Sequence, residues 1–134
     1  MSILGFFEAS LVGGFATSMT DWFFTGVLFH EKYRAYPEVW WRTADKSGEN
    51  RAVAIGAVIG LVAAAVFVAG ASALGLTSLA AALGLALLMW LSAALPILVS
   101  WALFAKIHPL VIVAHAAGWL VRLALLGVAV AYFC

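Results

Sequence analysis

Residues 51–74 read RAVAIGAVIGLVAAAVFVAGASAL, and after Arg51 this stretch contains no charged side chain. A helix needs about 20 mostly apolar residues to cross the hydrocarbon core of a bilayer. The stretch meets that requirement, so it predicts a transmembrane helix. Three more stretches have the same length and character and predict three further spans, at about residues 3–29, 77–105 and 109–133.

The composition of the whole chain supports the same fold class. Of its 134 residues, 66% are hydrophobic and only 10% are charged, and the mean hydropathy is +1.13. A soluble domain would carry about 25% charged residues. The alternation of apolar and polar residues that marks an outer-membrane barrel is missing from the sequence. We therefore predict one all-α integral membrane domain, residues 1–134, built as a four-helix transmembrane bundle whose main partner is the lipid bilayer.

The charged residues predict the orientation of this bundle. Nine of the thirteen Asp, Glu, Lys and Arg residues lie between Glu31 and Arg51, so residues 30–50 form the first connection. Four basic residues lie there, Arg51 follows directly after them, and Lys106 lies in the third connection. The second connection and both termini contain none. By the positive-inside rule, connections one and three are cytoplasmic and both termini lie outside, as in a multi-pass protein of the inner (plasma) membrane.

The first connection also carries aromatic residues interleaved with its charges. Pro37 is expected to open a short helix there. Such a segment is typical of an interfacial anchor, which lies at the level of the lipid headgroups with its aromatic side toward the membrane. A platform for a partner protein is the alternative reading. The expected anchor residues are Tyr33, Tyr36, Trp40 and Trp41.

Helices 2 and 3 are predicted to form a tight antiparallel hairpin, because only two residues separate the spans. Gly75 suits the position just after a helix, where the backbone often turns left-handed. Thr77 or Ser78 suits the N-cap of the next helix.

Small residues recur at helical spacing on two of the predicted helices. Gly5, Ala9 and Gly13 form one such ridge on the first helix, and Gly56 and Gly60 form another on the second. Ridges of this kind let a neighbouring helix approach closely. We expect them to pack within the bundle, and a contact in a homo-oligomer is the alternative.

The polar residues inside the spans predict a meeting point of three helices. At a rise of about 1.5 Å per residue, Asp21 and His115 fall roughly 7–9 Å to the cytoplasmic side of the midplane, and Arg122 and Ser92 fall near it. A charge facing lipid costs about 2.5–3.5 kcal/mol on insertion scales. We therefore predict a buried cluster of Asp21, His115 and Arg122, supported by Ser92, whose carbonyl lacks a donor because of Pro96.

Further polar residues share the helix faces of this cluster and are expected to line it. They are Thr17, Ser18 and Thr25 on the first helix and Ser100 on the third. The cluster has two interpretations: an ion pair and hydrogen-bond network that fixes helix order, or a polar or proton-responsive site, because histidine titrates near neutral pH.

Several function classes find no support in the sequence. Only His115 of the three histidines lies deep in a span, so we expect no metal site, no haem and no other cofactor. The sequence motifs of common hydrolases and nucleotide-binding loops are missing. An enzyme is therefore not expected, and a net charge of +1 gives no reason to expect nucleic-acid binding.

Glu8 lies near the outer end of the first span and is expected to reach water there. A role like that of the acidic residue in small multidrug-resistance transporters is the alternative, and the shallow position of Glu8 argues against it. The first span also differs from a cleaved signal peptide, because it contains Glu8 and no basic segment precedes it.

The end of the first helix carries a family resemblance. Asp21–Phe29, DWFFTGVLF, followed by Lys32, is similar to a Trp-Tyr then Leu-Phe-Gly-Lys pattern. With Trp90, Pro96 and Gly127 in matching order further along, the chain resembles the bacterial membrane proteins called domain-of-unknown-function family seventeen-sixty-one. The resemblance implies four transmembrane helices and brings no established activity.

Two functions therefore remain open from the sequence. One is a membrane protein, expected to be oligomeric, that handles a small solute or ion through the cluster of Asp21, His115 and Arg122. The other is a non-catalytic accessory or structural subunit of a larger membrane complex. A cavity that reaches Asp21 would favour the first function, and a closed bundle with a large apolar contact surface would favour the second.

Overall fold

The computed structural model describes residues 2–35 and 46–134, and within these residues the chain consists of helices joined by short non-helical connections. The elements are α1 (Ile3–Asp21), η1 (Trp22–Leu28), η2 (His30–Ala35), α2 (Lys46–Ala73), α3 (Leu79–Met89), η4 (Trp90–Ala94), α4 (Leu95–Phe104) and α5 (Pro109–Phe133). Of these, η1 and η4 are π-helical and η2 is a 3-10 helix.

Within the described residues, four helical segments are long and apolar enough to cross a membrane. They cover Ile3–Leu28, Arg51–Ala73, Leu79–Phe104 and Pro109–Phe133. The first and third spans are composite, because a π-helical segment continues or interrupts the α-helix in each. This confirms the all-helical class and the four apolar spans predicted from the sequence.

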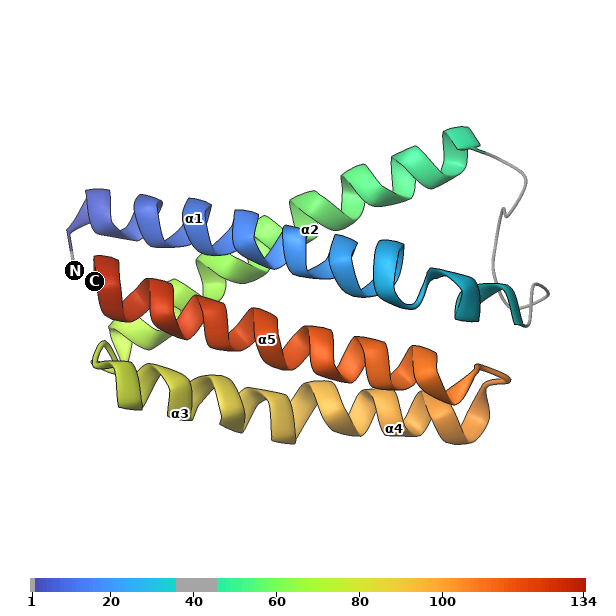
Figure 1. Ribbon diagram of the computed structural model, residues 1–134. Helices are drawn as coiled ribbons and strands as arrows, with labels where there is room; N and C mark the ends of the chain where they lie inside the picture. The colour runs from blue at the N-terminus through green and yellow to red at the C-terminus, as the bar shows by residue number, and fades with distance from the viewer. Residues whose placement is uncertain (1, 36–45) are drawn as a thin grey trace.

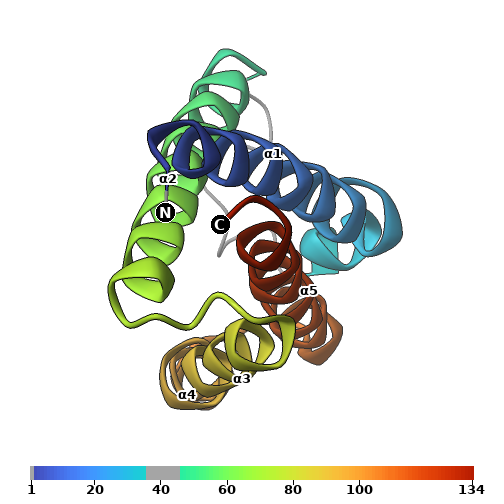
Figure 2. The ribbon, with the colours of Figure 1, turned by 90° about the vertical axis from the view of Figure 1, so that its left-hand side faces the viewer.

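Helix α5 is the element that the other spans share. α1 packs along α5 and along α2, while α3 and α4 pack on α5. Figures 1 and 2 show α5 beside α1 on one side and α3–α4 on the other, with α2 crossing behind. The N- and C-termini lie close together at one end of the bundle, and the connection between α4 and α5 lies at the other end (Figure 1).

The turn between α2 and α3 has the chemistry that the sequence predicts. Gly75 has a φ of +70°, and the N–H of Leu76 donates to the carbonyl of Ala71 at 2.8 Å. The hydroxyl of Ser78 caps α3 by accepting from the N–H of Ala81 at 3.3 Å. The two helices therefore reverse direction within a few residues.

Beyond this turn, α2 and α3 do not run along each other as the expected tight hairpin would. Each finds its packing surface elsewhere, α2 on α1 and α5, and α3 on α5. Figure 2 shows α2 and the α3–α4 rod separated, with only the turn passing between them. The helix α2 begins at Lys46, five residues before the start predicted for the second span, and the apolar span within it begins at Arg51.

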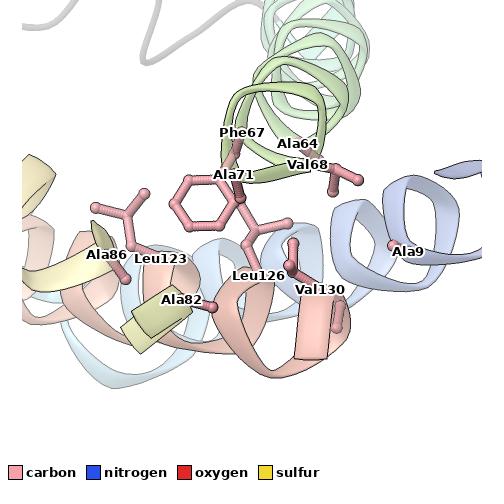
Figure 3. Close-up of a cluster of buried hydrophobic side chains, with 11 residues drawn as sticks. Ala9, Ala64, Phe67, Val68, Ala71, Ala82, Ala86, Leu123, Leu126 and Val130 are labelled. Atoms are coloured by element: carbon pink, nitrogen blue, oxygen red, sulfur yellow. The ribbon is translucent and has the colours of Figure 1, made fainter. Parts of the chain in front are cut away.

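A core of small and branched side chains holds α2, α3 and α5 together near the end of the bundle that carries the termini. In Figure 3, Phe67 and Ala71 of α2 lie over Leu123 and Leu126 of α5. Small residues dominate this core because close helix approach replaces the hydrophobic effect as the driving force in a bilayer. The core residues are Ala9, Ala64, Phe67, Val68, Ala71, Ala82, Ala86, Leu123, Leu126, Ala129 and Val130.

The small-residue ridge of α1 lies in this packing. A Cβ atom built on Gly13 would lie 2.7 Å from Leu126 Cδ2, and one on Gly14 would lie 2.6 Å from Leu61 Cδ2. Adjacent glycines thus admit α5 on one side of α1 and α2 on the other.

The ridge of α2 behaves differently at its two glycines. Gly60 is buried beside Arg122, whereas a Cβ atom on Gly56 would meet nothing within 4 Å. Gly56 therefore does not pack within a single chain, because α2 diverges from α1 toward its beginning (Figure 1) and residues 51–59 are all exposed.

The predicted interfacial anchor lies mostly outside the described residues. Tyr36, Trp40 and Trp41 belong to the part of the chain that is not described, as does the expected helix start at Pro37. The backbone of Tyr33 lies in η2.

Candidate functional site

The central feature of the site is an ion pair between two transmembrane helices. Arg122 Nη1 donates to Asp21 Oδ2 at 2.5 Å. Asp21 is the last residue of α1, and Arg122 lies close to the midpoint of α5. The Arg122 side chain is 11% exposed and the Asp21 side chain is 46% exposed. The pair therefore has a buried cation and a half-buried anion.

The guanidinium of Arg122 is held by groups from three helices. Its Cζ atom lies 4.5 Å from the ring centroid of Trp119, one turn earlier on α5, in a cation–π arrangement. A Cβ atom on Gly60 of α2 would lie 3.4 Å from Arg122 Nη2 and 3.9 Å from Ser18 Oγ. A larger residue at position 60 would push against the guanidinium, so Gly60 is what lets α2 close over it.

His115 completes the group of titratable residues that the sequence singles out. It lies about two turns before Arg122 on α5 and is half-buried. It interacts electrostatically with both Asp21 and Arg122. The structure thus brings the three residues of the predicted cluster together, with Asp21 as the acceptor for Arg122.

The first π-helical segment begins where the ion pair is made. η1 starts at Trp22, directly after Asp21, and ends as Phe29 N–H donates to the carbonyl of Phe24, five residues back, at 3.1 Å. This segment brings Phe24 over Gly118 of α5, where a Cβ atom would lie 3.8 Å from the ring. Single π-helical turns inside α-helices occur frequently at functional sites.

The second π-helical segment meets α5 at nearly the same level. At the end of η4, the N–H of Leu95 donates to the carbonyl of Trp90. Pro96 follows immediately and has no N–H to donate to Ser92, so the wider turn accommodates the missing bond. Trp90 itself donates from Nε1 to the carbonyl of Ala116 on α5 at 2.8 Å.

Two of the predicted lining residues on α1 lie beside the ion pair. Thr17 Oγ1 and Ser18 Oγ both donate to the carbonyl of Gly14, at 2.8 and 3.0 Å. Thr17 is buried and shares a cavity wall with Arg122. The side chain of Thr25, the third such residue, is outside the described part of the structure.

Ser92 and Ser100 do not join this cluster, which corrects the prediction for both. Both residues are exposed on the outer face of the third span. Ser92 Oγ donates to the carbonyl of Leu88 in its own helix at 2.7 Å, which satisfies the hydroxyl without a partner helix. The face of this span that meets α5 is instead formed by residues such as Ala82, Ala86 and Leu98.

Two partly open cavities lie on one side of α5. The first, of about 240 Å³, lies between α5 and α2 and includes Arg122, Thr17 and Gly60 in its wall. The second, of about 430 Å³, lies between α5 and the η4–α4 region and includes His115, Leu98 and Trp101. Their sizes bracket the lower end of the range for small-molecule sites.

Three residues line both cavities: Met89, Trp119 and Leu123. Sequence reasoning did not assign Trp119 to the site. The signal was present in its spacing, because residue 119 is four after His115 and three before Arg122, which places all three on one helix face. No local feature of the sequence indicated that Met89 lines the cavities or that α2 and α4 lie apart.

Comparison with protein-family models, with curated proteins and with solved structures found no match for this chain. The resemblance drawn from Asp21–Phe29 therefore stays an expectation, and the functional argument rests on the site alone.

Proposed function

We propose that this protein binds a small, largely apolar solute within the membrane. Arg122 and His115 form the polar end of the binding site, and Asp21, outside the cavity walls, is the ion-pair partner of Arg122. The observation that carries the proposal is the position of Arg122. It is a buried cation in an apolar span and also part of a cavity wall. Ionisable residues inside a membrane mark substrate pathways by default.

The walls of the cavities favour a solute over an inorganic ion. Beside the polar residues Thr17 and Arg122, the wall of the first cavity is made of apolar residues and a glycine. In the second cavity, His115 and the indoles of Trp101 and Trp119 are the groups able to form hydrogen bonds. A bare or hydrated ion needs several oxygen or nitrogen ligands along its route. An apolar solute with one polar group matches these walls better.

If the ion pair were purely structural, protein groups would be expected to bury both of its side chains. Pairs that only fix helix order gain most when their remaining donors are satisfied by protein. Here Asp21 is 46% exposed and Arg122 borders a cavity. The pair is thus accessible on one side, which supports a binding role.

The orientation expected from the charges belongs to the same proposal. With both termini outside the cytoplasm, η2 and the connection between α4 and α5 face the cytoplasm. Asp21 and His115 then lie on the cytoplasmic half of the bundle, about 8 Å from its midplane. The site would sit in the inner leaflet of the plasma membrane.

Cavity-filling variants test the proposal. Ala63 of α2 lines the first cavity, whereas Ala57 of the same helix is exposed. We expect a membrane-soluble alkyl diazirine to label Phe67 and Leu126 in vesicles, because these buried residues line only the first cavity. Ala63→Phe should abolish this labelling, and Ala57→Phe should leave it unchanged. Equal labelling of both variants at these residues would contradict the proposal.

A second function, that of an accessory subunit, is favoured by one specific observation. Residues 51–59 of α2 are exposed on all sides, and Gly56 has no neighbour within 4 Å of its Cβ position. If this segment packs against a second helix, Gly56→Leu should weaken oligomers of the purified protein, while Gly70→Leu on the same helix should not. Unchanged cross-linking in Gly56→Leu membranes would exclude this contact.

A further inference from the structure

We infer that the solute is electrically neutral and carries a hydrogen-bond acceptor, such as a carbonyl oxygen, which Arg122 binds. The inference rests on the proposed function and adds the chemical class of the ligand. Three properties of the cavity walls lead to it: the donors that Arg122 presents, the charge already balanced at the site, and the shape of the apolar space.

The first property is the kind of hydrogen bond that the site can form. Arginine has five N–H donors and no acceptor. Nη1 of Arg122 donates to Asp21, and Nη2 lies toward Gly60, on the side of the first cavity. A ligand group that meets this edge must therefore accept a hydrogen bond. An ammonium group would instead face a cation, so amines are a poor match for the first cavity.

The second property is the charge balance. The titratable side chains in the two cavity walls are Arg122 and His115. Asp21 already neutralises Arg122 across α1 and α5. A carboxylate or phosphate beside Arg122 would place a second anion near Asp21 in a medium of low dielectric constant. A buried charge without a full partner is costly there. A neutral acceptor takes up the hydrogen bond and leaves the balance intact.

The third property is the shape of the space. The cavity walls follow α5 from His115 to Leu126, a length of about 16 Å at the helical rise per residue. Trp119 lines both cavities and offers a flat aromatic surface along this path. An elongated apolar body would lie over Trp119 with its acceptor at Arg122 and its tail against Leu98 and Trp101.

The separation between α2 and α4 gives such a molecule a way in from the bilayer. Both helices pack on α5 and lie apart from each other (Figure 2). The first cavity lies between α5 and α2, and the second lies between α5 and the η4–α4 region. The route is bordered by apolar residues such as Val66 and Ile97. A neutral amphiphile partitions into lipid and can reach the cavities by this route without passing through water.

Four photoreactive probes of equal alkyl length test the ligand class. They end in a methyl ketone, a carboxylate, an ammonium and a methyl group. In vesicles containing the full-length protein, we expect the ketone to label Trp119 and Leu123, which line both cavities, about tenfold more efficiently than the methyl probe. Excess unlabelled ketone should remove this difference. The ammonium probe should label these residues no better than the methyl probe.

The double variant Asp21→Asn/Arg122→Met removes the cation and its partner together, so no unpaired charge is buried. In this variant, ketone labelling should fall to the level of the methyl probe, and methyl-probe labelling should stay unchanged. Should the variant fail to fold, the comparison of head groups on the natural chain still decides the question.

The outcomes separate the ligand class from the proposed function. Stronger labelling by the carboxylate than by the ketone would overturn neutrality and keep a solute site. Equal labelling by all four probes, with displacement by excess alkyl chain, would overturn the role of Arg122 alone. Absence of label from Trp119 and Leu123 with every probe would overturn the site itself.

Discussion

Arg122 combines three interactions that offset its burial in an apolar helix. Asp21 accepts its hydrogen bond, Trp119 lies under its guanidinium, and Gly60 leaves room above it. A lone arginine near the centre of a bilayer costs about 2.5–3.5 kcal/mol on insertion scales. A charge-assisted hydrogen bond contributes about 1.5–3 kcal/mol, so these contacts offset the insertion cost.

Breaking the pair from either side should destabilise the bundle. We expect Arg122→Gln and Asp21→Asn each to lower the free energy of unfolding by about 2 kcal/mol. The loss should be the smaller of the two for Asp21→Asn, because the carboxylate is half-exposed. The double variant should lose less than the sum, with a coupling of about 1–2 kcal/mol. Unfolding in mixed micelles titrated with dodecyl sulfate measures all three.

Glu8→Gln is the matched control for this cycle. Glu8 belongs to the same helix as Asp21 and is exposed. Its substitution should leave the unfolding midpoint unchanged. Additive effects of Asp21→Asn and Arg122→Gln would contradict the pairing.

Of the two glycines of α5, Gly127 leaves less space for an added side chain. A Cβ atom there would lie 3.1 Å from the carbonyl oxygen of Ala82, which is backbone and cannot rotate away. We expect Gly127→Ala to lower the free energy of unfolding by about 1–3 kcal/mol by forcing α3 away from α5. Gly70→Ala, with nothing within 4 Å of its Cβ position, should change it by less than about 0.5 kcal/mol. Equal effects at the two positions would contradict the contact.

At the scale of elements, the two π-helical segments fix how the first and third spans meet α5. η1 places Phe24 on Gly118, and η4 places the Trp90 indole on the carbonyl of Ala116. Both contacts fall within one turn of His115 and Trp119. The widened turns thus support the same part of α5 that carries the proposed site.

Loss of the Trp90 hydrogen bond should loosen the attachment of the third span. We expect Trp90→Phe to lower the free energy of unfolding by about 0.6–1.5 kcal/mol, the range for hydrogen bonds between transmembrane helices. Trp101→Phe, at a position that is 56% exposed on the same span, should have a smaller effect. A Trp90→Phe variant as stable as the natural chain would show that this bond contributes nothing to packing.

At the scale of the whole molecule, the bundle is packed unevenly. α5 is covered by α1 and α3, while the side between α2 and α4 holds the two cavities. Residues 51–59, in the half of α2 nearest Arg51, are all exposed. The open side and the splayed helix are therefore where a ligand or a partner would meet this protein.

The orientation expected from the basic residues is directly testable. In a Cys134→Ser background, we expect Lys106→Cys to react with an impermeant maleimide only after the inner membrane is permeabilised. Ser2→Cys should react in intact spheroplasts, because both termini are expected outside. Both positions are exposed, so access depends on the side of the membrane alone. The reverse pattern would contradict the expected topology.

The sequence by itself determined the features that depend on local chemistry. Span lengths, the left-handed Gly75 and the helix start at Ser78 follow from composition, backbone freedom and side-chain capping. The approach of Asp21 to Arg122 was also predictable, because the cost of exposing either charge to lipid is large and few partners exist.

Only the tertiary structure decided how each helix is rotated and where it diverges. Ser92 and Ser100 are both exposed, and the Ser92 hydroxyl bonds to its own helix, so polarity alone does not fix which face is buried. The π-helix after Asp21 and the splay of α2 depend on contacts between residues far apart in the chain. Trp119 reaches the site through that same packing. A bilayer around four such apolar spans would be as apolar as their own side chains. Rotation is then set by shape and by scarce polar contacts instead of by a hydrophobic pattern.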